Sequence, residues 1–128
     1  MKRPGTKAGT ANRKRHERRG RFSELLAAAL LCLKGYRILA RRHRSHAGEI
    51  DLIAVRGRRL AFVEVKLRPT MDAAEAAKTR SQAERMARAA EQWVWRHPGY
   101  LGYEIGLDAL LLAPGRLPRH QPNAMQRA

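Results

Sequence analysis

Apolar and polar positions alternate most regularly over residues 48–66, GEIDLIAVRGRRLAFVEVK, and this pattern predicts a β-hairpin. Two apolar runs flank Gly57-Arg58, a Gly-X pair that suits a two-residue type II′ turn. Because side chains alternate between faces with a period of two, such a turn places four charged side chains on one face. They form two facing pairs, Asp51 with Glu64 and Glu49 with Lys66.

A helix precedes the hairpin in the predicted order of elements. Its apolar residues share helical spacing, so we expect them to face the core: Phe22, Leu25, Leu26, Ala29, Leu30 and Leu33. Gly35 ends this helix as a residue that tolerates the left-handed conformation.

The apolar run of this helix is too short to span a membrane and lacks a cleavage site, so we expect no membrane contact. The lone Cys32 excludes a disulfide framework within the chain and favours a cytoplasmic location.

The remaining pattern completes a mixed sheet flanked by helices. Residues 36–42 are expected to form a first strand, and the second hairpin strand is apolar on its other face, so it should be central. A long helix, capped by Asp72 and ending near Arg96, precedes a last strand over residues 103–112. The predicted fold class is therefore α/β, with elements in the order α-β-β-β-α-β.

The charge of the chain points to an anionic polymer as its partner. The net charge is +16 over 128 residues, and residues 1–19 contribute +7 of it. Residues 1–19 have no apolar periodicity, so we expect a disordered basic tail ahead of a single domain over residues 20–128. Such a tail suits contact with phosphates without sequence preference.

The facing carboxylates of the hairpin suggest a metal site. Directly opposed side chains have Cβ atoms roughly 4.5–5.5 Å apart, so Asp51 and Glu64 repel each other unless a cation lies between them. Magnesium often takes one or two protein carboxylates and keeps waters or phosphate in the rest of its shell. Lys66 could then steer a water or stabilise phosphate charge. A salt-bridged, solvated face is the alternative, with Glu49 paired to Lys66 and Asp51 to an arginine.

The motifs together resemble a known family. GEIDLIA followed by FVEVK, with Glu24 upstream, GYRIL between and RHQPNA near the C-terminus, is similar to the YraN-like uncharacterised proteins. These proteins resemble the PD-(D/E)XK, or restriction endonuclease-like, nuclease superfamily, which includes Holliday-junction resolvases. The resemblance runs from about Gly20 to the C-terminus. It departs from the superfamily's name at Ile50, where that name has proline.

The resemblance implies a role for each matching residue. Asp51 and Glu64 correspond to the metal-binding carboxylates, and Lys66 corresponds to the catalytic lysine. Glu24 matches an acidic residue on the first helix that faces the same site. Gln82 matches a polar helix residue that reaches toward the site, and we assign it to nucleic-acid contact.

The expected function is a metal-dependent endonuclease that hydrolyses DNA, with branched DNA as one candidate substrate and magnesium or manganese as cofactor. Arg41, Arg42 and Arg44, in the basic segment RRHRSHAG, are expected to contact phosphates from a loop. A resolvase would need a homodimer to cut two strands symmetrically. The alternative is a catalytically silent DNA-binding accessory protein that keeps the nuclease fold. An RNA-binding protein is disfavoured because the hairpin displays few aromatic side chains.

Overall fold

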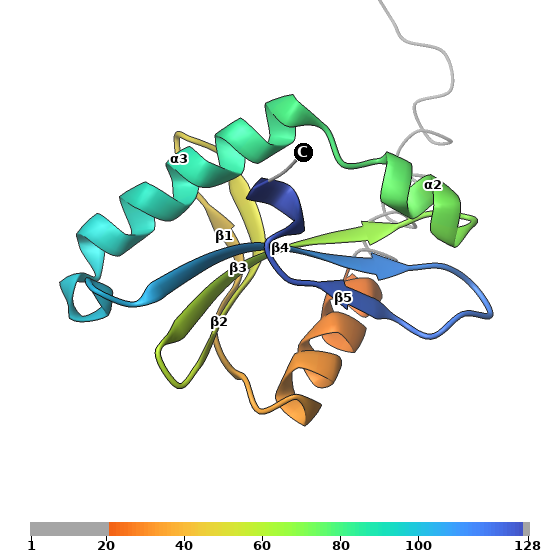
Figure 1. Ribbon diagram of the computed structural model, residues 1–128, viewed down its shortest axis with the longest axis horizontal. Coiled ribbons are helices and arrows are strands. Elements are labelled where there is room, and N and C mark those ends of the chain that lie inside the picture. Colours follow the sequence, from red (N-terminus) through yellow and green to blue (C-terminus); the bar gives the residue numbers. More distant parts are fainter. Residues whose placement is uncertain (1–20, 127–128) are drawn as a thin grey trace, which may run out of the picture.

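A five-stranded mixed sheet forms the centre of the computed structural model, which describes residues 21–126 (Figure 1). The strands lie in the order β1-β2-β3-β4-β5, and all neighbours are antiparallel except the parallel pair β3 and β4. Their bounds are Arg37–Arg44 for β1, Glu49–Arg56 for β2, Arg59–Leu67 for β3, Glu104–Leu112 for β4 and Arg119–Gln121 for β5.

Helices cover both faces of this sheet. The first helix, residues 21–33, lies against one face, and the connection between β3 and β4 covers the other (Figure 1). That connection contains α2 (Met71–Ala76), α3 (Arg80–Arg96) and the short 3₁₀ helix η1 (Pro98–Tyr100), and a second one, η2 (Ala124–Gln126), follows β5. The order confirms the predicted α/β class with a restriction endonuclease-like α-β-β-β-α-β core.

The predicted hairpin register is confirmed over residues 52–63. Leu52 pairs with Val63, and the pairing continues to Arg56 and Arg59 on either side of the turn. Gly57 has a φ of 57°, as the first turn position of a type II′ turn requires. β3 is central, as expected, because β2 and β4 flank it.

Two separate cores hold the helices on the sheet. Under α3, Ile53, Phe62 and Leu111 pack with the apolar face of the helix, which includes Trp93. On the opposite face, the first helix packs on Leu52, Ala54, Ala61, Val63 and Leu110. Alternate residues of β2 and β3 thus supply both cores, which makes this part of the sheet buried on both sides.

The predicted long helix is wrong in one respect, because it is two helices. Residues 77–79 interrupt it, and each helix begins at its own threonine cap. Thr70 accepts a hydrogen bond from the backbone N–H of Ala73, and Thr79 accepts one from that of Gln82. Hydroxyl caps of this kind satisfy amide groups that the first turn leaves unpaired. Asp72 lies inside the first turn of α2 instead of capping it.

The predicted buried face of the first helix is also wrong. Ala27 and Leu31 are fully buried, and Glu24 is buried beside them. This rotation of the helix leaves exposed most of the side chains expected inside, namely Phe22, Leu25, Leu26, Ala29 and Leu33. Cys32 is exposed too. The predicted helix end is confirmed, since Gly35 has a φ of 94° and the N–H of Tyr36 bonds to the carbonyl of Leu31.

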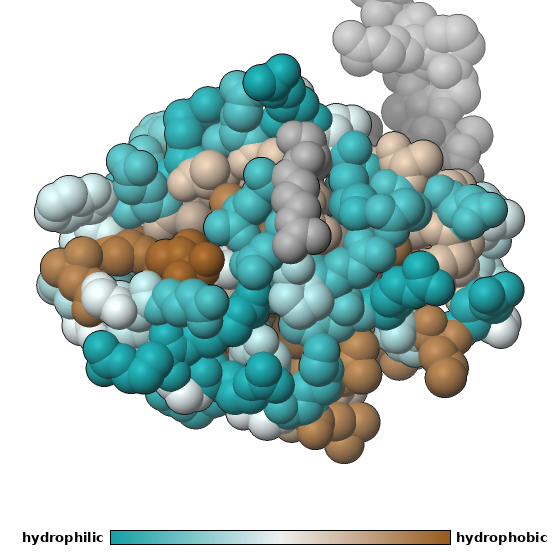
Figure 2. All heavy atoms as spheres, in the orientation of Figure 1, coloured by the Kyte–Doolittle hydropathy of each residue, from teal (hydrophilic) through white to brown (hydrophobic). Residues whose placement is uncertain are grey.

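The short strand β5 and the distribution of surface side chains complete the description of the fold. β5 was not predicted; it is short, follows a proline-containing segment, and pairs His120 with Leu110 of β4. On a mostly hydrophilic face of the molecule, Figure 2 shows hydrophobic side chains below the sheet, near the first helix. None of the helices within residues 21–126 is long and apolar enough to cross a membrane. The predicted tail over residues 1–19 lies outside the described part of the chain.

Candidate metal and nucleic-acid site

The candidate site lies where β2 and β3 stop pairing. The backbone pairing of β2 with β3 ends at Leu52 and Val63. At the next position the side chain of Asp51 contacts β3, and its Oδ2 accepts a hydrogen bond of 2.7 Å from the backbone N–H of Val65. Leu52 packs under the first helix, whereas Ile50 packs under α3. Strict alternation would put Ile50 and Leu52 on one face, so the alternation breaks at Asp51. The Asp51 carboxylate therefore lies in the gap between the two strands.

Asp51 and Glu64 form an acidic pair in which only Glu64 has a described ion-pair partner, Lys66. Burial, followed by the nearby charge of Glu64, raises the pKa of Asp51 to about 7, although the hydrogen bond from Val65 opposes this shift. Burial also raises the pKa of Glu64, although the charge of Lys66 opposes this shift. Two half-buried carboxylates that resist ionising together favour a bound cation.

Lys66 lies beside this pair and is almost fully buried, with 2% of its surface exposed. Its Nζ is 3.6 Å from Glu64 Oε1 and donates a 2.5 Å hydrogen bond to Oε1 of Gln82. Gln82 stands in the first turn of α3, which the Thr79 cap fixes in place. Gln82 reaches toward the site as predicted, with its amide oxygen against the lysine, and its contact with nucleic acid stays a prediction.

Glu24 is held by Arg42 on the other side of the site. Arg42 Nε donates to both carboxylate oxygens of Glu24, each at 2.8 Å. Arg42 also has a φ of 55°, a left-handed conformation that is unusual for a bulky side chain. Local strain of this kind costs about 1–3 kcal/mol and is found mostly at functional sites.

Two predictions about charged neighbours are corrected. Arg41, Arg42 and Arg44 all lie in β1 and not in a loop; Arg41 and Arg42 fall within the predicted strand, and Arg44 joins them because the strand runs two residues further than expected. Glu49 does not face Lys66: β1 pairs it with Arg44, and the two side chains form an exposed ion pair of 3.1 Å. The reason is that β3 has already separated from β2 at this point. Arg41 is exposed on the same edge strand.

The protein donors for a metal are two carboxylates. Within residues 21–126, no three or more His, Cys, Asp and Glu side chains gather in an arrangement that could hold a metal ion. Glu24, engaged with Arg42, is therefore not part of a three-carboxylate cluster. Asp51 and Glu64 alone match what magnesium commonly takes from a protein, since water and phosphate oxygens fill the rest of its shell.

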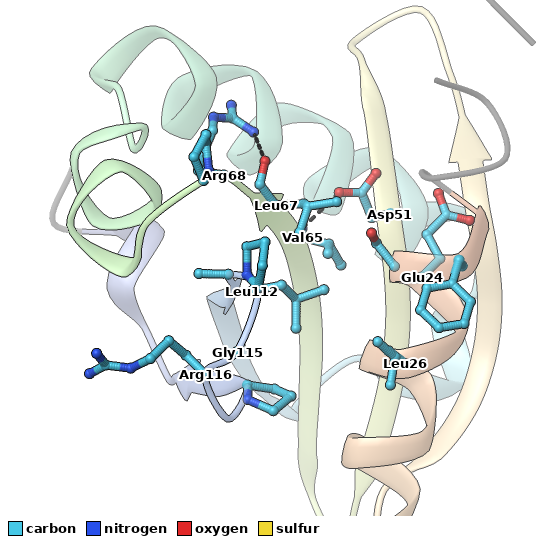
Figure 3. Close-up of a pocket in the computed structure, with 15 residues that line it drawn as sticks. Glu24, Leu26, Asp51, Val65, Leu67, Arg68, Leu112, Gly115 and Arg116 are labelled. Carbon is cyan, nitrogen blue, oxygen red and sulfur yellow. Dashed lines mark hydrogen bonds between the residues drawn. The ribbon is translucent and has the colours of Figure 1, made fainter. Parts of the chain in front are cut away.

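A pocket of about 1150 Å³ opens beside Asp51, between the first helix and the ends of β3 and β4 (Figure 3). We call it the Asp51 pocket. Glu24 and Asp51 contribute its acidic groups, and most other lining side chains are apolar. Sequence reasoning missed this pocket. The signal was present in Phe22 and Leu26, whose helical spacing was taken for a buried face.

Sequence reasoning also missed a second polar cluster, around Asp108 of β4. This side chain is fully buried and receives two hydrogen bonds of 2.8 Å from Arg59. His120 and the backbone N–H of Asn123 each contact it at 2.8 Å. Both residues belong to the RHQPNA segment, so this segment ties the end of the chain to the sheet.

The fold and the site define a small α/β protein with a half-buried acidic pair at the open end of a β-hairpin. Residues 23–112 match the model of the uncharacterised protein family UPF0102, and the chain belongs to this family. The predicted YraN-like resemblance is therefore confirmed.

Similar proteins extend along nearly the whole chain. A UPF0102 protein of Methylorubrum extorquens is 49% identical over 124 residues, which cover 97% of this chain and 96% of that protein. One from Nitrobacter winogradskyi is 52% identical over 101 residues, covering 79% of this chain and 86% of the relative. One from Rhodopseudomonas palustris is 47% identical over 121 residues, which cover 94% of this chain and 90% of that protein.

Proposed function

We propose that this protein is a metal-dependent endonuclease that hydrolyses phosphodiester bonds in DNA. The observation that carries the proposal is the half-buried pair of Asp51 and Glu64 with the buried Lys66 beside it. Burying two carboxylates together is unfavourable, and no other described cation is placed to neutralise Asp51 by a hydrogen bond or ion pair. The same three positions match the carboxylates and lysine of the PD-(D/E)XK nucleases that the sequence resembles.

Asp51 and Glu64 would hold magnesium or manganese through their carboxylate oxygens. A divalent ion bound there supplies a Lewis acid that lowers the pKa of water and offsets charge on the scissile phosphate. Lys66, held by Gln82, keeps an ammonium group beside the carboxylates, where it can orient the attacking water. Burial of this lysine limits its movement and excludes bulk water from its surroundings.

Nucleic acid is the partner that the charge supports. An excess of 16 positive charges attracts a polyanion at long range, and the arginines of β1 continue this charge beside the site. Arg41 and Arg44, both exposed, are placed to contact phosphates. Arg42 would orient Glu24 within the site. A cytoplasmic location and a homodimer belong to the same proposal.

A catalytically silent DNA-binding accessory protein is the second candidate. It is favoured by the double hydrogen bond from Arg42 to Glu24, which keeps that carboxylate away from a metal. The two candidates differ in what the acidic pair does. In the silent protein, neutralising Asp51 should leave every DNA-dependent property unchanged.

The experiment is incubation of the purified protein with linear, single-stranded, flapped and four-way DNA, with magnesium, manganese or a chelator. We expect cleavage only with a divalent ion, and its loss in Asp51→Asn, Glu64→Gln and Lys66→Met. Glu84→Gln is the matched control, because this exposed glutamate of α3 makes only a 3.9 Å contact with Arg80. No cleavage of any substrate by the wild type would favour the silent protein.

A further inference from the structure

We propose that the Asp51 pocket receives unpaired bases of the DNA, so that single-stranded or flapped DNA is the preferred substrate over continuous duplex. This inference rests on the proposed function, because it names the substrate class of that same site. Asp51 and Glu24 line the pocket, so an occupant would lie directly against the candidate metal site.

The walls of the pocket are the first reason. They are formed largely by apolar side chains, with Phe22 and Leu26 on the helix facing Val65 and Leu67 of β3 and Leu112 of β4. Phosphate and sugar gain little from such walls. The flat face of a base binds favourably to apolar and aromatic side chains by stacking. In duplex DNA, neighbouring base pairs cover that face. An apolar pocket next to a phosphate-cleaving centre therefore suits a strand whose bases are free.

Phe22 is the side chain best placed to stack on a base. Its surface is 64% exposed although it is aromatic, and it lines the pocket from the same helix as Glu24. Folding does not bury this ring against the core. Exposed aromatic side chains are the usual stacking platforms of proteins that bind single strands.

The cations of the pocket are the second reason. Arg116 lies across the pocket from Glu24, and Arg68 follows the end of β3 (Figure 3). Arg68 lines the pocket and directly follows β3, the strand that carries Glu64, so one chain segment supplies both the pocket and the metal site. An apolar middle with arginines on one side and carboxylates on the other fits a short stretch of nucleotides. Bases would occupy the middle, and phosphates would contact the arginines and the metal site.

The test compares binding of two fluorescent oligonucleotides of equal length by the full chain, in chelator so that nothing is cut. One is ordinary single-stranded DNA, and the other carries abasic linkers at its centre. Both have the same phosphates, so charge contacts cancel in the comparison. We expect the wild type to bind the ordinary strand roughly 5- to 150-fold more tightly, the range that loss of one base stack produces.

Variants of the first helix assign this preference to the pocket. Phe22→Ala should reduce the ratio of the two affinities toward one, whereas Phe22→Trp should retain it. Leu25→Ala is the matched control, because Leu25 is 52% exposed on the same helix and does not line the pocket. Equal affinity of the wild type for both strands, or a ratio that Phe22→Ala leaves unchanged, would overturn the inference. So would a change of oligomeric state in Phe22→Ala without a change of ratio, which would make the pocket an interface between copies.

The outcomes separate this inference from the proposed function. Base-dependent binding without any cleavage in magnesium would support the pocket and refute the nuclease. Metal-dependent cleavage without base-dependent binding would support the nuclease and refute the pocket. When both hold, flapped and single-stranded DNA should be cut faster than blunt duplex of the same sequence.

Discussion

Asp51 and Asp108 are two aspartates on the same sheet with opposite surroundings. Asp108 receives both arms of the Arg59 guanidinium, the ring of His120 and a backbone N–H. Asp51 receives one backbone N–H, and other carboxylates surround it. The charge of Asp108 is therefore balanced by a cation and by hydrogen-bond donors. Asp51 has one hydrogen-bond donor and no described ion-pair partner.

The pKa values of the two groups differ accordingly. Burial alone would raise the pKa of Asp108, but hydrogen bonds from Arg59, His120 and Asn123 outweigh it and lower the pKa to about 2. For Asp51, burial and Glu64 act in the same direction and raise the pKa to about 7. A compensated buried charge supports the fold, whereas an uncompensated one is a cost that a ligand can offset. We therefore assign Asp108 to stability and Asp51 to function.

The largest effect expected from this comparison is loss of stability in Asp108→Ala. The substitution leaves the mostly buried Arg59 guanidinium without its partner, and breaking a buried pair typically costs about 3–5 kcal/mol. Urea denaturation of the variant and the wild type measures the difference. Glu84→Ala, which removes an exposed carboxylate, should cost less than about 1 kcal/mol. A loss in Asp108→Ala as small as in this control would remove Asp108 from its structural role.

Opposite pH dependences should follow from the two pKa shifts. The folded protein holds a proton on Asp51 that the unfolded chain loses near pH 3.9, so this group makes stability fall between about pH 4 and pH 7. In Asp51→Asn that decline should shrink by roughly 2–4 kcal/mol. Asp108 acts in the reverse sense: its contribution is complete above about pH 4 and is lost as pH falls toward 2. Thermal melts of the wild type and Asp51→Asn from pH 4 to pH 8 measure the effect of Asp51. An equal fall in stability with pH in the two proteins would contradict it.

A smaller effect is expected from Gly106→Ala. A Cβ at Gly106 would lie 2.2 Å from a guanidinium nitrogen of Arg59 and 2.8 Å from Asp108, so the ion pair must move apart. We expect a cost of about 1–3 kcal/mol from strain in this packed position, measured by chemical denaturation. Gly99→Ala is the control, because a Cβ there meets nothing within 4 Å. Equal stability of the two variants would show that Arg59 is free to leave Asp108.

The sequence was a good guide where structure depends on neighbours along the chain. Alternation near the Gly57-Arg58 turn predicted the correct register over residues 52–63, and Gly35 predicted the correct helix end. Asp51, Glu64 and Lys66 were picked out by the same local pattern. Asp51 lies in the gap between β2 and β3, with Glu64 and Lys66 on β3 beside it, and the roles predicted for the three residues stay predictions.

The parts that sequence reasoning missed depend on distant contacts. The first helix turns Ala27 inward and Phe22 outward, and its contact with Arg42 of β1 fixes Glu24 on the buried side. Helical spacing alone is compatible with either rotation when most of a helix is apolar. The partners of Asp108 are up to 49 residues away in sequence, so no local pattern reveals them.

The central claim, that Asp51 is reserved for a cation, is tested most directly by thermal melts of wild type and Asp51→Asn with and without magnesium or manganese. Without metal, Asp51→Asn should be at least as stable as the wild type, because it removes repulsion with Glu64. At metal concentrations about tenfold above the dissociation constant, the wild type should gain about 1.4 kcal/mol, and the variant should gain nothing. A destabilised Asp51→Asn together with a wild type that does not respond to metal would contradict the account.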